Sequence, residues 1–210
     1  MSSVRYTLVS EGSSDTVLMP ILDWVLHENG VYVSESVWAE LRTLPKPPTT
    51  PVKPIEKALE LYPCDLLFIH RDADNQDYDV RKRWVLDHLD KITLKPPAVC
   101  IIPVRMQETW LLIDENAIRE AVGKPNSSTR LYIPPLRNLE NYADSKTKLH
   151  HLLLEASGTT GRNRKKFNVH VAKHRIPQFI KDFSPLRNLS AFAALETDIQ
   201  TIIDKQGWND

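Results

Sequence analysis

The clearest structural signal in the sequence is the segment Leu66-Leu67-Phe68-Ile69-His70-Arg71-Asp72-Ala73-Asp74. Its first four residues are all apolar, which is typical of a strand that is buried on both faces of a parallel sheet. The run ends directly at a polar segment that carries two acids. Because side chains alternate along an extended segment, we expect Asp72 and Asp74 to point to the same side.

A similar pattern occurs near the start of the chain. The short β-prone run Arg5-Tyr6-Thr7-Leu8-Val9 is followed by the turn Glu11-Gly12-Ser13-Ser14-Asp15. Ser13 or Ser14 can cap a helix, and apolar residues then recur at helical spacing from Val17 to Leu26. We expect Pro20 to kink this helix in its early turns because proline removes one backbone donor.

Strand and helix signals alternate through the first part of the chain and then give way to helices. We expect a further strand within 31–41, alone or running into a helix, and another over 99–102. We expect helices over 55–61, 78–89, 108–122, 145–156, 165–180 and 191–203. The alternating units predict an α/β fold, a mostly parallel sheet flanked by helices. We therefore predict an α/β domain over residues 1–125 and a helical extension, packed on it, over residues 126–210.

Acidic residues follow two of the predicted strands. In an open α/β sheet, ligands bind beyond the carboxyl ends of the strands, so Glu11, Asp72 and Asp74 would meet if their strands are neighbours. Such carboxylates repel each other by about 4 kcal/mol per pair at an intermediate dielectric. A proton, a basic side chain or a divalent cation must offset this repulsion. Oxygen ligands without histidine or thiolate favour Mg²⁺ or Mn²⁺.

These acids also have a simpler interpretation, as helix caps and turn formers. Asp15 is one turn further on. It is a candidate additional metal ligand, or an acid that the first turn of a helix favours without any ligand. Gly12 permits a tight turn, and the helix that starts behind Ser13 and Ser14 could direct its free amides toward a phosphate.

The densest basic stretch lies in the C-terminal half. If a helix begins near Lys165, then Lys166 and Lys173 share a face, and we expect Lys165, Lys166 and Lys173 as candidate phosphate contacts. The alternative is an ordinary solvated surface.

The segments described above resemble the motifs of Toprim domains. The stretch from Leu8 to Asp15 resembles the first Toprim motif, an apolar strand followed by Glu-Gly-x-x-Asp, and the stretch from Leu66 to Asp74 resembles the second, an apolar strand followed by Asp-x-Asp. Met106 to Leu112, followed by Asp114 and Ala117, is similar to a stretch in small stand-alone bacterial Toprim-like proteins related to OLD (overcoming lysogenization defect) nucleases. The resemblance covers residues 5–122.

The resemblance implies magnesium-dependent phosphoryl transfer and a role in phage defence. Glu11 would act as general acid/base or metal ligand, and Asp72 and Asp74 as metal ligands. Glu108 would be a further metal-site acid, or else an ordinary acid of an early helical turn. The chain has no Walker A sequence, so the ATPase half of an OLD enzyme is missing, and it has no room for the separate tyrosine domain of Toprim topoisomerases.

We therefore expect a metal-dependent nuclease that acts on DNA or RNA. The alternatives are a non-cleaving module that docks on a partner ATPase or on nucleic acid, and a phosphotransfer enzyme that acts on a small nucleotide. The net charge decides nothing, because 27 Lys and Arg balance 27 Asp and Glu. Two cysteines, no signal peptide and no long apolar run predict a cytoplasmic protein that does not enter a membrane. The oligomeric state is open, a homo-oligomer included.

Overall fold

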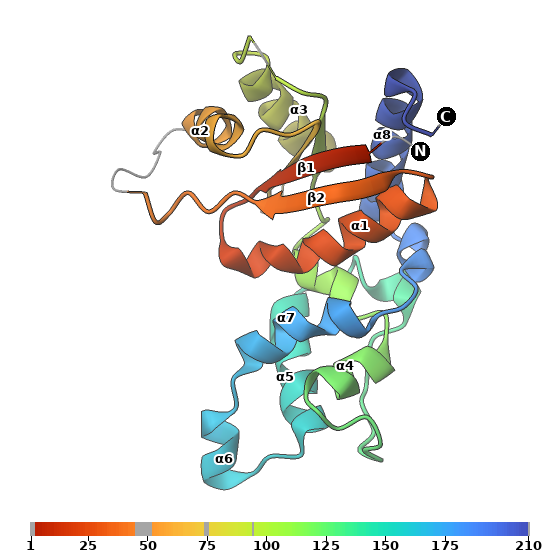
Figure 1. Ribbon diagram of the computed structural model, residues 1–210. Helices are drawn as coiled ribbons and strands as arrows, with labels where there is room; N and C mark the ends of the chain where they lie inside the picture. Colours follow the sequence, from red (N-terminus) through yellow and green to blue (C-terminus); the bar gives the residue numbers. More distant parts are fainter. Residues whose placement is uncertain (1–2, 45–51, 74–75, 94, 210) are drawn as a thin grey trace.

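The computed structural model describes residues 3–44, 52–73, 76–93 and 95–209 (Figure 1). Its sheet has the strand order β2-β1-β3-β4, and every pair of neighbours is parallel. The strands are β1 (Ser3–Val9), β2 (Tyr32–Trp38), β3 (Leu66–His70) and β4 (Ala98–Ile101). The α/β fold predicted from the sequence is confirmed. Because Val9 at the end of β1 pairs with Ile69 of β3, the segments that follow the two strands start side by side.

Helices lie on both faces of the sheet (Figure 1). The first part of the chain contributes 3-10 helices η1 (Ser13–Leu18) and η2 (Gln107–Leu111) and α-helices α1 (Met19–Glu28), α2 (Lys53–Leu61), α3 (Tyr78–Leu89) and α4 (Glu115–Ala121). The alternation of side chains along β3 divides the core. Leu66 and Phe68 belong to the cluster that includes α1, whereas Leu67 and Ile69 belong to the cluster that includes α2 and α3.

The later part of the chain is helical and packs against the sheet. It consists of η3 (Leu136–Asn138), α5 (Ser145–Ser157), α6 (Gly161–Lys166), α7 (Val169–Phe179), η4 (Ser184–Asn188) and α8 (Ser190–Gln206). Leu152 of α5, Ile176 of α7 and Phe192 of α8 share one core with Phe68 of the sheet. The division of the chain at residue 125 stays a prediction. No helix in the described ranges is both long and apolar enough to cross a membrane.

Three helices differ from those expected. Pro20 lies in the first turn of α1, after η1 has ended, so it stands where a helix needs no backbone donor and does not kink the helix interior. The helix expected over 108–122 is two elements, since Asp114 caps α4 by accepting hydrogen bonds from two backbone amides. The helix expected over 165–180 is also divided. Asn168 caps α7 by accepting a hydrogen bond from the amide of Val171.

Candidate functional site

A pocket of about 330 Å³ opens at the edge of the sheet where β1, β3 and β4 end. Its walls come from the turn after β1, the residues after β3 and the segment around η2, with one residue of α5. Four of the predicted site acids line it together: Glu11, Asp15, Asp72 and Glu108. Asp74 lies outside the described residues. The arrangement follows from the strand order, because neighbouring parallel strands deliver their C-terminal residues to the same edge.

Asp15 forms the buried part of this pocket. Its carboxylate accepts hydrogen bonds from the Gly12 amide (3.2 Å), from the Ser14 hydroxyl (2.9 Å) and from Nε2 of Gln107 (2.7 Å). These donors tie the turn after β1 to η2. Asp15 therefore fixes the shape of the pocket, and the protein itself satisfies much of its hydrogen-bonding capacity.

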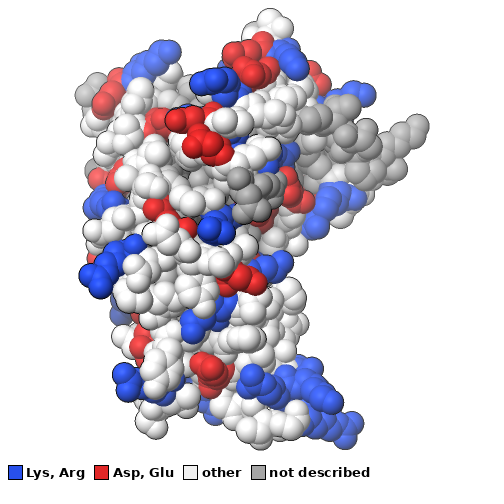
Figure 2. All heavy atoms as spheres, turned by 180° about the vertical axis from the view of Figure 1, so that it is seen from behind, with Lys and Arg blue, Asp and Glu red and all other residues white. Residues whose placement is uncertain are grey.

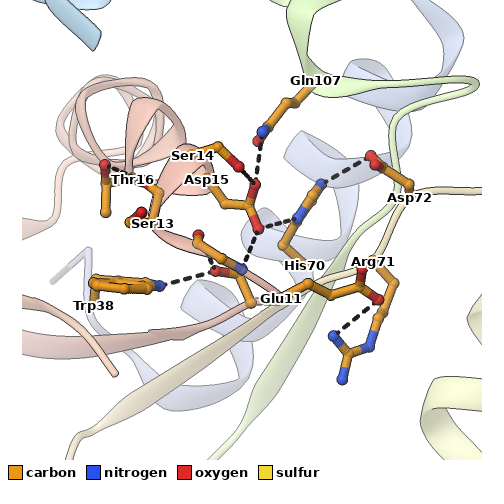
Figure 3. A network of polar contacts seen from close by, with 12 residues as sticks. Glu11, Ser13, Ser14, Asp15, Thr16, Trp38, His70, Arg71, Asp72 and Gln107 are labelled. Carbon is orange, nitrogen blue, oxygen red and sulfur yellow. Dashed lines mark hydrogen bonds and ion pairs between the residues drawn. The ribbon is translucent and has the colours of Figure 1, made fainter. Parts of the chain in front are cut away.

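His70, the last residue of β3, lies between two carboxylates (Figure 3). Its Nδ1 is 3.4 Å from Oδ2 of Asp15, and its Nε2 is 3.4 Å from Oδ1 of Asp72. Burial by itself lowers the pKa of His70, but the two carboxylates outweigh burial and raise this pKa to about 9. Burial raises the pKa of Asp15, but His70 and the hydrogen-bond donors bring it well below its usual value. At neutral pH the pocket thus holds a buried imidazolium between two acids.

The other two acids of the pocket also face basic groups. Glu11 is exposed, and its Oε1 is 3.3 Å from Nη1 of Arg71 (Figure 3). Glu108 is buried and accepts a hydrogen bond of 2.9 Å from Nζ of Lys173, which is also buried. The sequence left open a proton, a base or a cation as the group that offsets the repulsion between the acids. In the structure, a basic side chain faces each of the four acids that line the pocket.

The expected phosphate-binding residues are placed differently from the prediction. Lys173 is buried in its ion pair and lies on α7, whereas Lys165 and Lys166 are exposed on α6, so the three do not share a helix face. The prediction that Lys166 and Lys173 share a helix face was wrong, because Asn168 caps a new helix between them.

The turn after β1 also differs in detail. Gly12 and Ser14 line the pocket. Gly12 has extended backbone angles, and a side chain there would meet only ordinary van der Waals contacts, so the turn does not require glycine. Its amide is engaged by Asp15, and the carbonyl of Ser13 accepts a hydrogen bond from Thr16.

A magnesium site at this edge stays a prediction. Glu11 and Asp72 offer carboxylate oxygens, the ligands that magnesium prefers, and their side chains reach solvent with 65% and 39% of their surface exposed. Within the ranges that the structure describes, no three His, Cys, Asp or Glu side chains are grouped closely enough to hold a metal ion. An ion bound by Glu11 and Asp72 would compete with Arg71 and His70 for the same carboxylates.

Sequence reasoning missed Arg71, which pairs with Glu11 of the pocket, and two residues of the pocket lining, Gln107 and Lys146. Arg71 is adjacent to Asp72 in the sequence, and Gln107 is adjacent to Glu108, so each could have been found as a polar neighbour of a predicted acid. Lys146 comes from α5, and only the packing of α5 beside η2 brings it to the pocket.

Comparison of the chain with protein-family models, curated proteins and solved structures gives no match. We therefore derive the function from the side chains that form the pocket.

Proposed function

We propose that this protein is a magnesium-dependent nuclease of Toprim type, which hydrolyses phosphodiester bonds of DNA or RNA in the pocket described above. The observation that supports the proposal most is the convergence of Glu11, Asp72 and Glu108, which follow three different strands, on one pocket. That pocket lies at the edge where parallel α/β sheets bind their ligands. Phage defence, as implied by the Toprim resemblance, is part of the same proposal.

In this proposal Glu11 and Asp72 hold the ion, with Asp74 as the further predicted ligand. A bound divalent ion would neutralise the charge that develops on the phosphate and lower the pKa of an attacking water. His70 orients the carboxylate of Asp72, because the buried carboxylate of Asp15 holds the other side of the His70 ring in place. Lys146 lines the pocket, so its ammonium group can reach a phosphate oxygen there.

The ion pairs of the pocket favour a second candidate, a non-cleaving module that docks on a partner ATPase or on nucleic acid. Glu11 faces Arg71, Glu108 faces Lys173, and His70 serves both Asp15 and Asp72. The described acids are thus compensated without a cation. Capture of an ATPase by the purified protein, together with no cleavage of any nucleic acid, would favour this candidate.

Cleavage assays separate the two candidates. Single- and double-stranded DNA and RNA are incubated with the protein in magnesium, and the variants Glu11→Gln and Asp72→Asn are compared with wild type. We expect either variant to lose about 100-fold or more of the cleavage rate, the size seen when one group that stabilises the transition state is removed. Glu11→Gln should keep the wild-type melting temperature because the Glu11 side chain is exposed, whereas Asp72→Asn should lower it slightly because it removes a charge that faces the buried His70.

Asp87→Asn is the matched control, since Asp87 is an exposed acid of α3 outside the pocket lining. This control should cleave at the wild-type rate. Cleavage by Glu11→Gln and Asp72→Asn at that same rate would refute the nuclease proposal.

A further inference from the structure

The basic residues of the C-terminal half are concentrated in a stretch without acids. Residues 156–181 contain seven Lys and Arg and no Asp or Glu, in a chain whose net charge is zero. Four of the seven belong to the short helix α6, and all four are exposed: Arg162, Arg164, Lys165 and Lys166. Within the described part of the chain none of the four forms an ion pair. In Figure 2, lysines and arginines gather at the lower right, the end of the molecule that carries α6 in Figure 1.

Polar groups of α5 and α7 connect α6 with the pocket. Lys146, in the first turn of α5, lines the pocket, and His150 lies one turn further along the same helix face. The ring of His150 packs edge-on against the ring of His170, with 5.5 Å between their centroids. His170 is in the first turn of α7, four residues after Lys166. Lys146, His150 and His170 therefore form a row of polar side chains that leads from the pocket to α6.

The distance from the pocket to α6 can be estimated from the length of α5. At a rise of 1.5 Å per residue, α5 extends about 17 Å from Lys146 to its end at Ser157. Phosphates of one strand of a duplex are about 3.4 Å apart along the helix axis. A strand that keeps this duplex rise, with one phosphate in the pocket, therefore reaches α6 after about five nucleotides.

We infer that Lys146, His150, His170 and the four basic residues of α6 form a track for the phosphodiester backbone of a nucleic acid that extends from the pocket. Lysine and arginine that neutralise phosphates release counterions, and this release drives binding. The four exposed charges of α6 fit this role, whereas the buried Lys173 does not. The inference rests on the proposed function for the chemistry at the pocket. It deepens that function by naming the surface of α5, α6 and α7 along which the polynucleotide substrate binds.

Binding measured without cleavage tests the track. Fluorescein-labelled DNA and RNA strands of 2, 4, 8 and 12 nucleotides are titrated with the protein in EDTA. We expect affinity to rise with length up to about eight nucleotides, once the strand spans α5 and α6, and then to level off. Changing all four residues Arg162, Arg164, Lys165 and Lys166 to Gln should weaken 12-nucleotide binding about tenfold or more. It should also lower the slope of log Kd against log salt by about 2 to 3.

The matched control removes four exposed charges elsewhere, by changing Arg83, Lys91, Arg137 and Lys205 to Gln. This control should keep the wild-type slope and length dependence. Equal weakening in both quadruple variants would overturn the track, since net charge alone would then explain binding. Unchanged binding by the α6 variant would also overturn the track. If the wild-type protein nevertheless cleaves nucleic acid in magnesium, the nuclease proposal would stand without the track. Loss of binding in the α6 variant alone, with no cleavage by the wild type, would support the track and refute the nuclease.

Discussion

The ammonium group of Lys173 donates a hydrogen bond of 2.9 Å to Oε1 of Glu108, and both side chains are buried. The pair joins α7 to η2 and therefore attaches the C-terminal helices to a wall of the pocket. Removing one partner of a buried ion pair is costly because the other charge stays behind unpaired, whereas replacing both by apolar residues is often nearly neutral.

This relationship gives a stability prediction. Lys173→Met or Glu108→Leu alone should lower the free energy of unfolding by about 3–5 kcal/mol, measured by urea denaturation. The double variant should lose much less than the sum of the two single losses. Losses that simply add would show that the two side chains do not depend on each other.

The buried His70 predicts how stability depends on pH. Its pKa is about 9 in the folded protein and near 6.5 in an unfolded chain, so the folded state keeps a proton that the unfolded state releases. The stability from this proton is complete below pH 6.5 and is lost as pH rises to about 9. Denaturant unfolding across this range should show the decline, and His70→Gln should remove it. A wild-type curve that is flat or rising over the same range would contradict the assignment.

Arg71 should compete with a metal ion for Glu11. Their ion pair of 3.3 Å is partly exposed, and such pairs contribute up to about 1 kcal/mol. Arg71→Gln should therefore strengthen manganese binding by up to about fivefold in calorimetric titrations. Arg83→Gln, a change at an exposed arginine of α3, serves as the control and should leave affinity unchanged. Weaker binding after Arg71→Gln would mean that Glu11 does not hold the ion.

Local sequence patterns predicted the strands and the edge of the sheet at which the pocket lies. The apolar run before His70 and the β-prone run before Glu11 predicted two buried strands. Acids at the ends of both runs predicted a shared pocket, because side chains there must face the carboxyl edge of a parallel sheet. The pairing of β1 with β3 then brought Glu11 and Asp72 to one pocket, as expected.

The partners of these acids could not be predicted in the same way. Lys173 meets Glu108 across 65 positions of the chain, and Gln107 meets Asp15 across 92, so both contacts depend on how helices pack. The division between α6 and α7 was predictable in principle. Asn168 stands directly before the apolar pattern of α7, which is a typical capping position. The prediction of a single helix over 165–180 did not take this cap into account.

The metal site itself is tested most directly by diffraction from crystals soaked in manganese. We expect an anomalous peak between Glu11 and Asp72, about 2.1 Å from a carboxylate oxygen of each, with Arg71 moved away from Glu11. No peak at this position in saturating manganese, with Glu11 still paired to Arg71 and Asp72 still facing His70, would contradict the proposed magnesium-dependent nuclease.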